Sequence, residues 1–204
     1  MLGRVTKNTT GIDLKHLFIG SEGTMGVITR LVLKFAPLPG ATNTALCALP
    51  SFEAAIRLVH ELRRALPGLS AFEVMWVNLM DAALAVGQLR LPFDKPAPVY
   101  ALVELQGQNE GEDRARLEAV LGNALEHGTV SDVVVAQSLE DANRLWAYRE
   151  AIGEMLGQTQ PYAAFDIGIP MAEMAGFVGA VREAGAPTPV CATAAPIFSG
   201  TSGT

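Results

Sequence analysis

The sequence predicts an α+β protein in which helices cover a largely antiparallel sheet. Over residues 41–183, short apolar runs with the period of a strand alternate with longer segments that have the period of a helix. Hydrophobic residues make up 50% of the chain and charged residues 18%, a balance typical of a packed globular protein. This alternation is compatible with parallel or antiparallel pairing, and we favour an antiparallel sheet with helices layered on it.

The predicted elements have recognisable starts and stops. Strands are predicted over residues 27–35, 44–49, 71–77, 99–105, 130–136 and 162–169. Helices are predicted over residues 52–66, 79–86, 117–125, 139–156 and 171–181. Ser51 and Ser138 are expected to cap the helices that follow them, with Asp141 in the capping-box position, and His127–Gly128 ends the third helix.

Prolines and a change of composition divide the chain into three parts. Pro37 and Pro39–Gly40 stop the first predicted strand, so a domain boundary is expected there, with residues 1–40 before it and 41–183 after it. Residues 184–204 have neither the strand period nor the helix period, and they are rich in Ala, Pro, Thr, Gly and Ser. They are predicted to form an irregular tail, which is either flexible or the product of a shifted reading frame or an abrupt truncation.

Charge and composition exclude several classes of function. A net charge of −6 argues against nucleic-acid binding and against docking on an anionic membrane. No apolar run reaches the roughly 18 residues of a spanning helix, and the N-terminus lacks the pattern of a signal peptide. Cys47 and Cys191 lie too far apart to suggest a metal knuckle, and the three histidines are not expected to be metal ligands. Reduced thiols favour a cytoplasmic location.

A glycine-rich loop precedes the first predicted strand. Gly20, Gly23 and Gly26 are spaced three apart and lead into a strand, which matches neither the Rossmann fingerprint nor the phosphate loop. Such a loop adopts positive φ angles and brings backbone N–H groups close to an anionic pyrophosphate or a flavin carbonyl. A tight connection without a ligand explains the same composition, so the spacing alone leaves both interpretations open.

Arg149 falls on the apolar stripe of the helix that follows Ser138, four residues after Leu145 and three before Ile152. Placing a guanidinium against a core costs several kcal/mol unless an anion pairs with it. That anion is either the carboxylate of a bound ligand or a carboxylate of the protein. The protein candidates are Glu73, Glu104 and Asp166.

The stretch around the glycine loop resembles a known flavoprotein family over more than thirty residues. Residues 7–39 are similar to the end of the FAD-binding domain in the para-cresol methylhydroxylase/vanillyl-alcohol oxidase superfamily, with Ile12 and Met25 as mild departures. The nearest branch contains glycolate oxidase large subunits, D-lactate dehydrogenases and D-2-hydroxyglutarate dehydrogenases. The resemblance implies that this loop lies against FAD, through Gly20, Ser21, Glu22, Gly23, Thr24, Gly26 and Ile28.

The helix motif at residues 145–150 and the segment 165–170 resemble the C-terminal domain of the same family. There the arginine that matches Arg149 binds the substrate carboxylate. In D-2-hydroxyglutarate dehydrogenases a threonine and a lysine hold the second carboxylate, and the matching positions here are Gly153 and Ala164. The resemblance therefore favours a monocarboxylate such as lactate or glycolate over hydroxyglutarate.

The implied function is oxidation of a small D-2-hydroxy acid with hydride transfer to FAD. The family's pyrophosphate cradle and its His- and Gly-Asp-Gly-rich motif, which supplies metal ligands and the catalytic base, have no match in this chain. No catalytic residue and no metal ligand are therefore assigned, although the full-length enzyme is compatible with a divalent metal. We expect the isolated chain to bind FAD weakly or not at all and to be inactive. The alternatives are a non-catalytic module that binds a small acid or a partner, and an inactive truncated gene product; the electron acceptor and any partner subunit stay open.

Overall fold

The computed structural model describes residues 11–33, 35, 37–87, 89–158, 167–185 and 193–194. The chain divides into two compact units, Met1–Leu38 and Pro39–Thr204. In the first unit, the 3-10 helix η1 (Leu14–Leu17) is followed by a series of turns. Asp13 caps η1 by accepting a hydrogen bond from the Lys15 backbone N–H.

The strand predicted over residues 27–35 is not formed. The described residues of this stretch have no regular secondary structure, and Val27, Leu31 and Leu33 are 86%, 66% and 64% exposed. A strand needs the backbone of a neighbouring strand to complete its hydrogen bonds, and no such neighbour is present among the described residues of this unit. The alternation of apolar residues therefore indicated a segment able to pair as a strand, and no such pairing occurs within the described residues.

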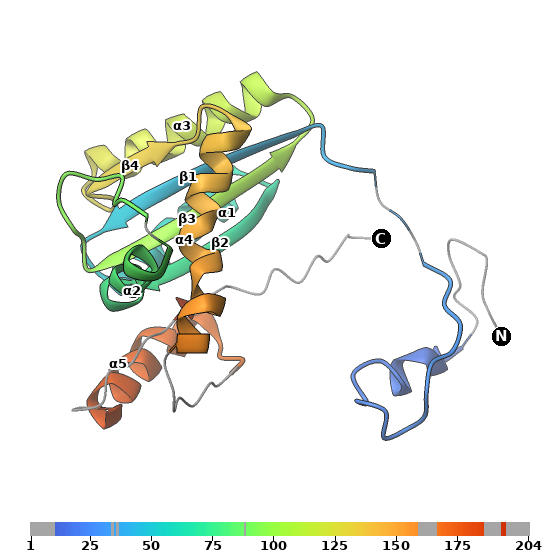
Figure 1. Cartoon of the computed structure of the whole chain (residues 1–204). Helices are drawn as coiled ribbons and strands as arrows, with labels where there is room; N and C mark the ends of the chain where they lie inside the picture. Colours follow the sequence, from blue (N-terminus) through green and yellow to red (C-terminus); the bar gives the residue numbers. More distant parts are fainter. Residues whose placement is uncertain are drawn as a thin grey trace. The chain divides into compact units, whose positions relative to one another are not determined.

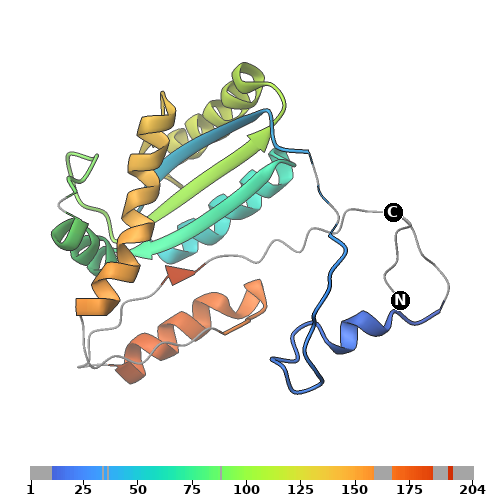
Figure 2. The same cartoon turned by 45° about the vertical axis from the view of Figure 1, so that its right-hand side comes forward.

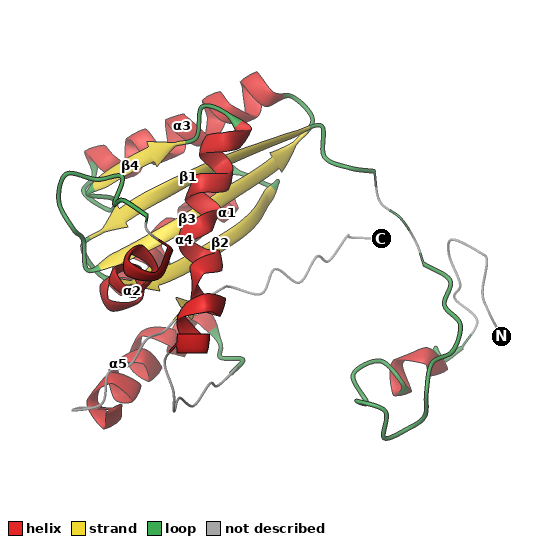
Figure 3. Cartoon of the chain, in the orientation of Figure 1, coloured by secondary structure: helices red, strands yellow, loops and turns green. Residues whose placement is uncertain are grey.

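The second unit is built on a five-stranded sheet with the order β4-β1-β3-β2-β5, shown in yellow in Figure 3. The strands are β1 (Ala41–Leu49), β2 (Leu69–Trp76), β3 (Val99–Gly107), β4 (Asp132–Val135) and β5 (Thr193–Ala194). All four neighbouring pairs are antiparallel. The predicted α+β class with an antiparallel sheet covered by helices is confirmed.

The connections make two interleaved β-α-β units. Helix α1 (Phe52–Ala65) joins β1 to β2, and α3 (Glu110–Glu126) joins β3 to β4. In each unit the two strands are parallel and a strand of the other unit lies between them, which is the split β-α-β arrangement of ferredoxin-like folds. Figure 2 shows α1 against the face of the sheet that is opposite to α4.

The sheet is covered on both faces. One face packs against α1 and α3, with Met171 and Met174 from the 3-10 helix η2 (Met171–Glu173) and from α5 (Met174–Gly185). The other face packs against α2 (Val77–Gly87) and α4 (Leu139–Gln158). Helix α4 crosses in front of the sheet in Figure 1, and its buried side chains belong to the same apolar cluster as Leu46 of β1, Met75 of β2 and Leu102 of β3.

Local capping fixes the helix starts. Ser51 Oγ accepts from the Ala54 backbone N–H at 3.2 Å, and Ser138 Oγ accepts from the Asp141 N–H at 3.1 Å, as the sequence predicts. Helix α3 begins seven residues before the predicted stretch because Asn109 caps it and its first turns are polar. That helix ends at His127, followed by Gly128 with a φ of 71°, a conformation that favours glycine.

Two predictions near the C-terminus fail where the structure describes them. The strand expected over residues 162–169 lies largely outside the described residues, and Ile167–Ile169 has no regular secondary structure. The tail was expected to be irregular, yet Thr193 and Ala194 pair with Met75 and Val74 of β2. A strand this short is specified by the open edge of β2 rather than by its own sequence.

Candidate functional site

Helix α4 places Trp146 and Arg149 over the sheet. Among the side chains of α4 that the structure describes, Leu145, Tyr148 and Met155 are buried, and they pack on the same sheet face as α2. Trp146 and Arg149 lie beside this stripe and are partly buried. Because they are three residues apart on a helix, they project on the same side, toward β2 and β3.

Arg149 is paired with Glu73 of β2. The Arg149 Nε donates to Glu73 Oε2 at 3.1 Å, and the two side chains are 39% and 16% exposed. Glu73 is one of the three carboxylates that the sequence offered as partners, whereas Asp166 lies outside the described residues. Within the described part of the chain, the terminal nitrogens Nη1 and Nη2 of Arg149 make no hydrogen bond or ion pair.

Glu104 of β3 accepts three side-chain hydrogen bonds. Its Oε2 accepts from Trp146 Nε1 at 3.0 Å, and its Oε1 accepts from Ser70 Oγ at 2.8 Å and from Gln106 Nε2 at 3.0 Å. These contacts were not predicted from the sequence, which offered Glu104 only as a candidate partner of Arg149. The spacing of Trp146 and Arg149 was the available signal, because residues three apart on a helix reach the same surface.

The two glutamates lie on the same sheet face. Glu73 is paired in register with Leu102, which is two residues from Glu104 on β3, and residues two apart in a strand point to one face. We call Glu73, Glu104, Trp146 and Arg149 the acid-site cluster. It holds one cation and two carboxylates, and the open end of the guanidinium suits a planar carboxylate bound through two parallel hydrogen bonds.

Two other positions of α4 lie close to Arg149 along the helix. The Tyr148 hydroxyl donates to the Arg90 carbonyl at 2.6 Å, and burial raises the pKa of Tyr148, so this hydroxyl is a fixed donor. Gly153 lies one helical turn after Arg149 and is exposed, and a side chain added there would meet no atom within 4 Å. Ala164, the other position that the resemblance singled out, lies outside the described residues.

The glycine loop of the first unit has an unusual backbone. Positive φ angles occur at Gly20 (80°), Glu22 (48°), Gly23 (82°) and Gly26 (143°). Glu22 is the strained member of this set, because residues with a Cβ rarely adopt positive φ. Three backbone hydrogen bonds close the turns, including Thr24 N to Ser21 O at 2.9 Å.

These turns leave some backbone donors of the loop without a partner. Within the described residues, the N–H groups of Glu22 and Gly23 make no hydrogen bond, and the loop around them is largely exposed. The hydroxyls of Ser21 and Thr24 donate to the Phe18 and Ser21 carbonyls at 2.9 and 2.6 Å, and the Ile28 side chain is 50% exposed. The loop can therefore offer backbone donors and one apolar side chain to a ligand, and contact of its residues with FAD stays a prediction.

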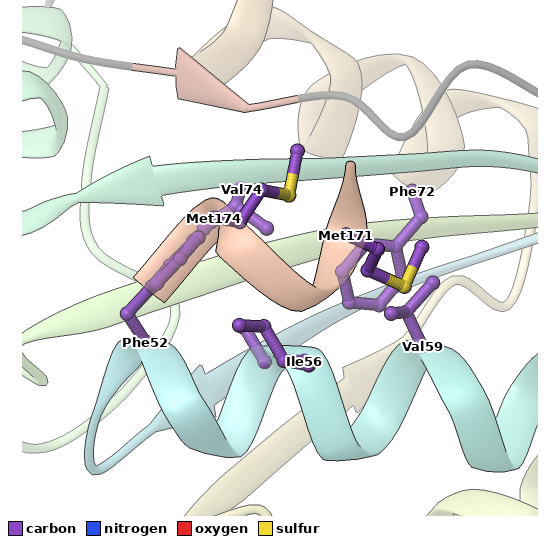
Figure 4. Close-up of a pocket in the computed structure, with 8 residues that line it drawn as sticks. Phe52, Ile56, Val59, Phe72, Val74, Met171 and Met174 are labelled. Atoms are coloured by element: carbon purple, nitrogen blue, oxygen red, sulfur yellow. The ribbon is translucent and has the colours of Figure 1, made fainter. Parts of the chain in front are cut away.

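An apolar hollow lies between α1, β2 and the segment 171–174 (Figure 4). Phe52 and Ile56 come from α1, Phe72 and Val74 from β2, and the two methionines Met171 and Met174 face them. None of these side chains titrates or donates a hydrogen bond, so the hollow belongs to the core and not to a chemical site.

Metal ligands and membrane spans are also absent from the part of the chain that the structure describes. No group of three or more His, Cys, Asp or Glu residues is placed to hold a metal ion there. None of the described helices is both long enough and apolar enough to cross a bilayer.

Comparisons with known proteins agree with the resemblance seen in the sequence. The family described as FAD linked oxidases, C-terminal domain, matches residues 38–194. The mitochondrial D-2-hydroxyglutarate dehydrogenase of Arabidopsis thaliana is 38% identical over 184 residues, which cover 89% of this chain and 33% of that protein. The D-2-hydroxyglutarate dehydrogenase of Xanthomonas citri pv. viticola is 34% identical over 174 residues, covering 85% and 36%. A mitochondrial protein of Schizosaccharomyces pombe that carries a D-lactate dehydrogenase name is 36% identical over 167 residues, covering 81% and 32%.

The fold has a solved counterpart. An alkyldihydroxyacetonephosphate synthase superposes with a TM-score of 0.61 at 17% identity, covering 92% of this chain and 40% of that one, which is a likeness of fold alone. The chain spans about a third of the length of the curated relatives it matches. The suspected kinship is confirmed by the extent of the family match and by these relatives. The chain belongs to the family of FAD-linked oxidases, of which residues 38–194 form the C-terminal domain.

Proposed function

We propose that this chain forms the substrate-binding part of an FAD-dependent oxidoreductase that oxidises a D-2-hydroxy acid. Residues 1–40 are the end of the FAD-binding domain in this proposal, and residues 41–183 are most of the domain that binds the substrate. Arg149 would bind the substrate carboxylate, bound FAD would supply the acceptor for the hydride from the hydroxyl-bearing carbon, and the hydroxyl proton would go to a general base. The kinship with 2-hydroxy-acid dehydrogenases supports this reaction class.

The observation that carries the proposal is the incomplete hydrogen bonding of the Arg149 guanidinium. One nitrogen is held by Glu73, while the two terminal nitrogens have no partner within the described residues. A partly buried cation held in this way is ready to bind an anion, and a carboxylate matches its planar donors. The absence of a side chain at Gly153 favours a small monocarboxylate, similar to lactate or glycolate, because nothing on this turn of α4 is available to hold a second carboxylate.

FAD would accept the hydride when it is bound. The unpartnered N–H groups of Glu22 and Gly23 fit a pyrophosphate oxygen or a flavin carbonyl, and the apolar side chain of Ile28 fits the flavin ring. This loop is exposed, so it supplies one side of a cofactor site and does not enclose it. A cytoplasmic location stays a prediction, since some relatives carry mitochondrial names.

We expect the isolated chain to retain no FAD. One open loop offers few contacts to a cofactor of this size, and affinity comes from burying most of a ligand's surface. Purified chain is mixed with excess FAD, passed through a gel-filtration column, and its absorption spectrum is recorded. A flavin band that stays with the protein peak would contradict the expectation, and unfolded protein treated in the same way controls for nonspecific retention.

We expect D-lactate to bind the chain with millimolar affinity and the Arg149→Ala variant to bind it at least about tenfold more weakly, because charge-assisted hydrogen bonds are lost. The measurement is an NMR titration that follows the Arg149 Nε–H and Trp146 Nε1–H resonances of the unsubstituted chain and the Trp146 resonance of the variant. Arg114→Ala is the matched control, since Arg114 is ion-paired with Glu118 on α3 at 2.9 Å. Equal binding by Arg149→Ala and the unsubstituted chain would refute the proposed role of Arg149 in binding the acid, a role that the enzyme shares with a non-catalytic module that binds a small acid.

A further inference from the structure

We propose that Glu104 is a positioning residue of the acid-site cluster: through Trp146 it fixes the rotation of α4 over the sheet and so keeps the Arg149 guanidinium in place for a ligand. The inference rests on the proposed role of Arg149 in binding a substrate carboxylate. Glu104 carries a negative charge, which by itself disfavours an acid, and the proposal gives it a role that favours binding through geometry.

The carboxylate of Glu104 is itself held in one orientation. Glu104 lies on β3, which pairs with β1 on one side and with β2 on the other. Its Oε1 accepts from Ser70 Oγ at 2.8 Å and from Gln106 Nε2 at 3.0 Å. Two donors on Oε1 fix the plane of the carboxylate, so Oε2 is directed at Trp146 Nε1, 3.0 Å away.

An irregularity of β2 brings Ser70 to this carboxylate. Leu69 is paired with Leu105 and Ala71 with Glu104, so the register of β2 against β3 shifts by one residue at Ser70. A β-bulge of this kind leaves one residue unpaired and redirects its side chain. The Ser70 hydroxyl lies 3.1 Å from the Glu104 carbonyl oxygen and 2.8 Å from the carboxylate. The sheet therefore departs from regular pairing at the residue that supports Glu104.

Two contacts from neighbouring strands meet one side of α4. Glu104 of β3 holds Trp146, and Glu73 of β2 holds Arg149, about 4.5 Å further along the helix axis. Leu145 packs on the same sheet face, but apolar packing has no preferred direction, whereas a hydrogen bond does. A rotation of α4 by about 20° would move a group about 6 Å from the helix axis by about 2 Å, which is enough to break the Glu73–Arg149 contact. The contact with Trp146 opposes that rotation.

The first test needs no ligand. Glu104→Ala removes the acceptor of the Trp146 Nε1–H, so we expect this NMR resonance to shift and the Arg149 Nε–H to exchange with solvent about tenfold faster. That factor corresponds to the loss of one hydrogen bond to a charged group. The internal control is the Nε–H of Arg114, which donates to Glu118 at 2.9 Å on α3. A general loss of stability would speed exchange at both arginines, and unchanged exchange at Arg149 would overturn the proposal.

Titration with D-lactate separates geometry from charge. If Glu104 acted on the ligand by its charge, removing that charge would strengthen the binding of an anion. We expect the opposite: Glu104→Ala raises the dissociation constant for D-lactate about tenfold. Glu104→Gln is neutral but keeps an acceptor for Trp146, so it should stay within about threefold of the unsubstituted chain. Glu118→Ala removes a carboxylate outside the cluster and is the matched control. Tighter binding of D-lactate by Glu104→Ala would contradict the positioning role.

A double-mutant cycle tests whether Glu104 acts through Trp146. Trp146→Phe keeps an aromatic ring and removes the N–H donor, so it should also raise the dissociation constant and speed exchange at the Arg149 Nε–H. Because both substitutions remove the same contact, the double variant should bind D-lactate about as weakly as either single variant. Additive effects would show that Glu104 acts by another route. Trp146→Phe also provides the test if Glu104→Ala does not fold.

The outcomes keep this proposal distinct from the proposed function. If Arg149→Ala weakens lactate binding while Glu104→Ala and Trp146→Phe change neither the binding nor the exchange at Arg149, the role of Arg149 stands and the role of Glu104 is refuted. If the unsubstituted chain does not bind D-lactate but exchange at the Arg149 Nε–H responds as expected, the positioning of Arg149 by Glu104 is supported and the proposed function fails.

Discussion

Replacing Leu102 by alanine is expected to lower the free energy of unfolding of the second unit by about 3 kcal/mol. Leu102 is 0% exposed on the central strand β3, where it is paired with Leu46 of β1 and with Glu73 of β2. Its side chain packs among the buried residues beneath α2 and α4. The truncation removes buried apolar area and leaves a cavity, because strands paired on both sides cannot move in to fill it.

Urea unfolding followed by circular dichroism measures this change. Leu139→Ala is the control: the same side chain is shortened in the first turn of α4, where Leu139 is 78% exposed. We expect that variant to stay within about 0.5 kcal/mol of the unsubstituted chain. A loss below about 1 kcal/mol for Leu102→Ala would show that the layer between α4 and the sheet is loosely packed.

The second large effect concerns Cys47, whose thiol should react at least about a thousandfold more slowly in the folded chain than in the unfolded chain. Cys47 lies on β1 and is 0% exposed, and burial raises its pKa from 9.0 to about 12. The thiolate is the reactive form, so three units of pKa alone make it about a thousandfold scarcer near neutral pH. Alkylation by iodoacetamide with and without urea measures the ratio in a Cys191→Ser variant, which leaves Cys47 as the single cysteine of the chain.

The same shift sets a pH dependence of stability. The folded pKa lies above the unfolded value, so the contribution of the neutral thiol is fully present below pH 9.0 and is lost as the pH rises toward about 12. Cys47→Ser removes this dependence and is the control. Fast alkylation in the absence of urea would contradict the burial of Cys47 beneath α1.

The sequence predicted the elements of the second unit because most of them carry a complete local signal. Ser51 and Ser138 cap helices with amphipathic stripes. The register of β1 with β3 aligns apolar side chains on both faces of the sheet, where helices cover them. Elements that depend on a distant partner were predicted poorly. The alternating residues 27–35 form no strand without a neighbour, and Thr193–Ala194 forms one because the edge of β2 is open.

The acid-site cluster was predictable only in part. Position on the apolar stripe of α4 identified Arg149 as a cation that needed an anion, and Glu73 was among the partners considered. The stripe could not choose between Glu73 and Glu104, because that choice depends on how α4 is rotated over the sheet. In the structure the buried stripe runs through Tyr148 and Met155, so Arg149 lies at its margin with 39% of its side chain exposed. This rotation is set by packing, which a single sequence does not display.

The contact between Glu73 and Arg149 joins positions 76 residues apart, and this separation constrains how the gene can change. A mutation that removes either charged group leaves the other charge partly buried without its partner, which destabilises the fold. A lineage that loses one partner therefore loses stability until a second mutation compensates. Glu73→Gln is the mild step, since it retains an acceptor for the guanidinium.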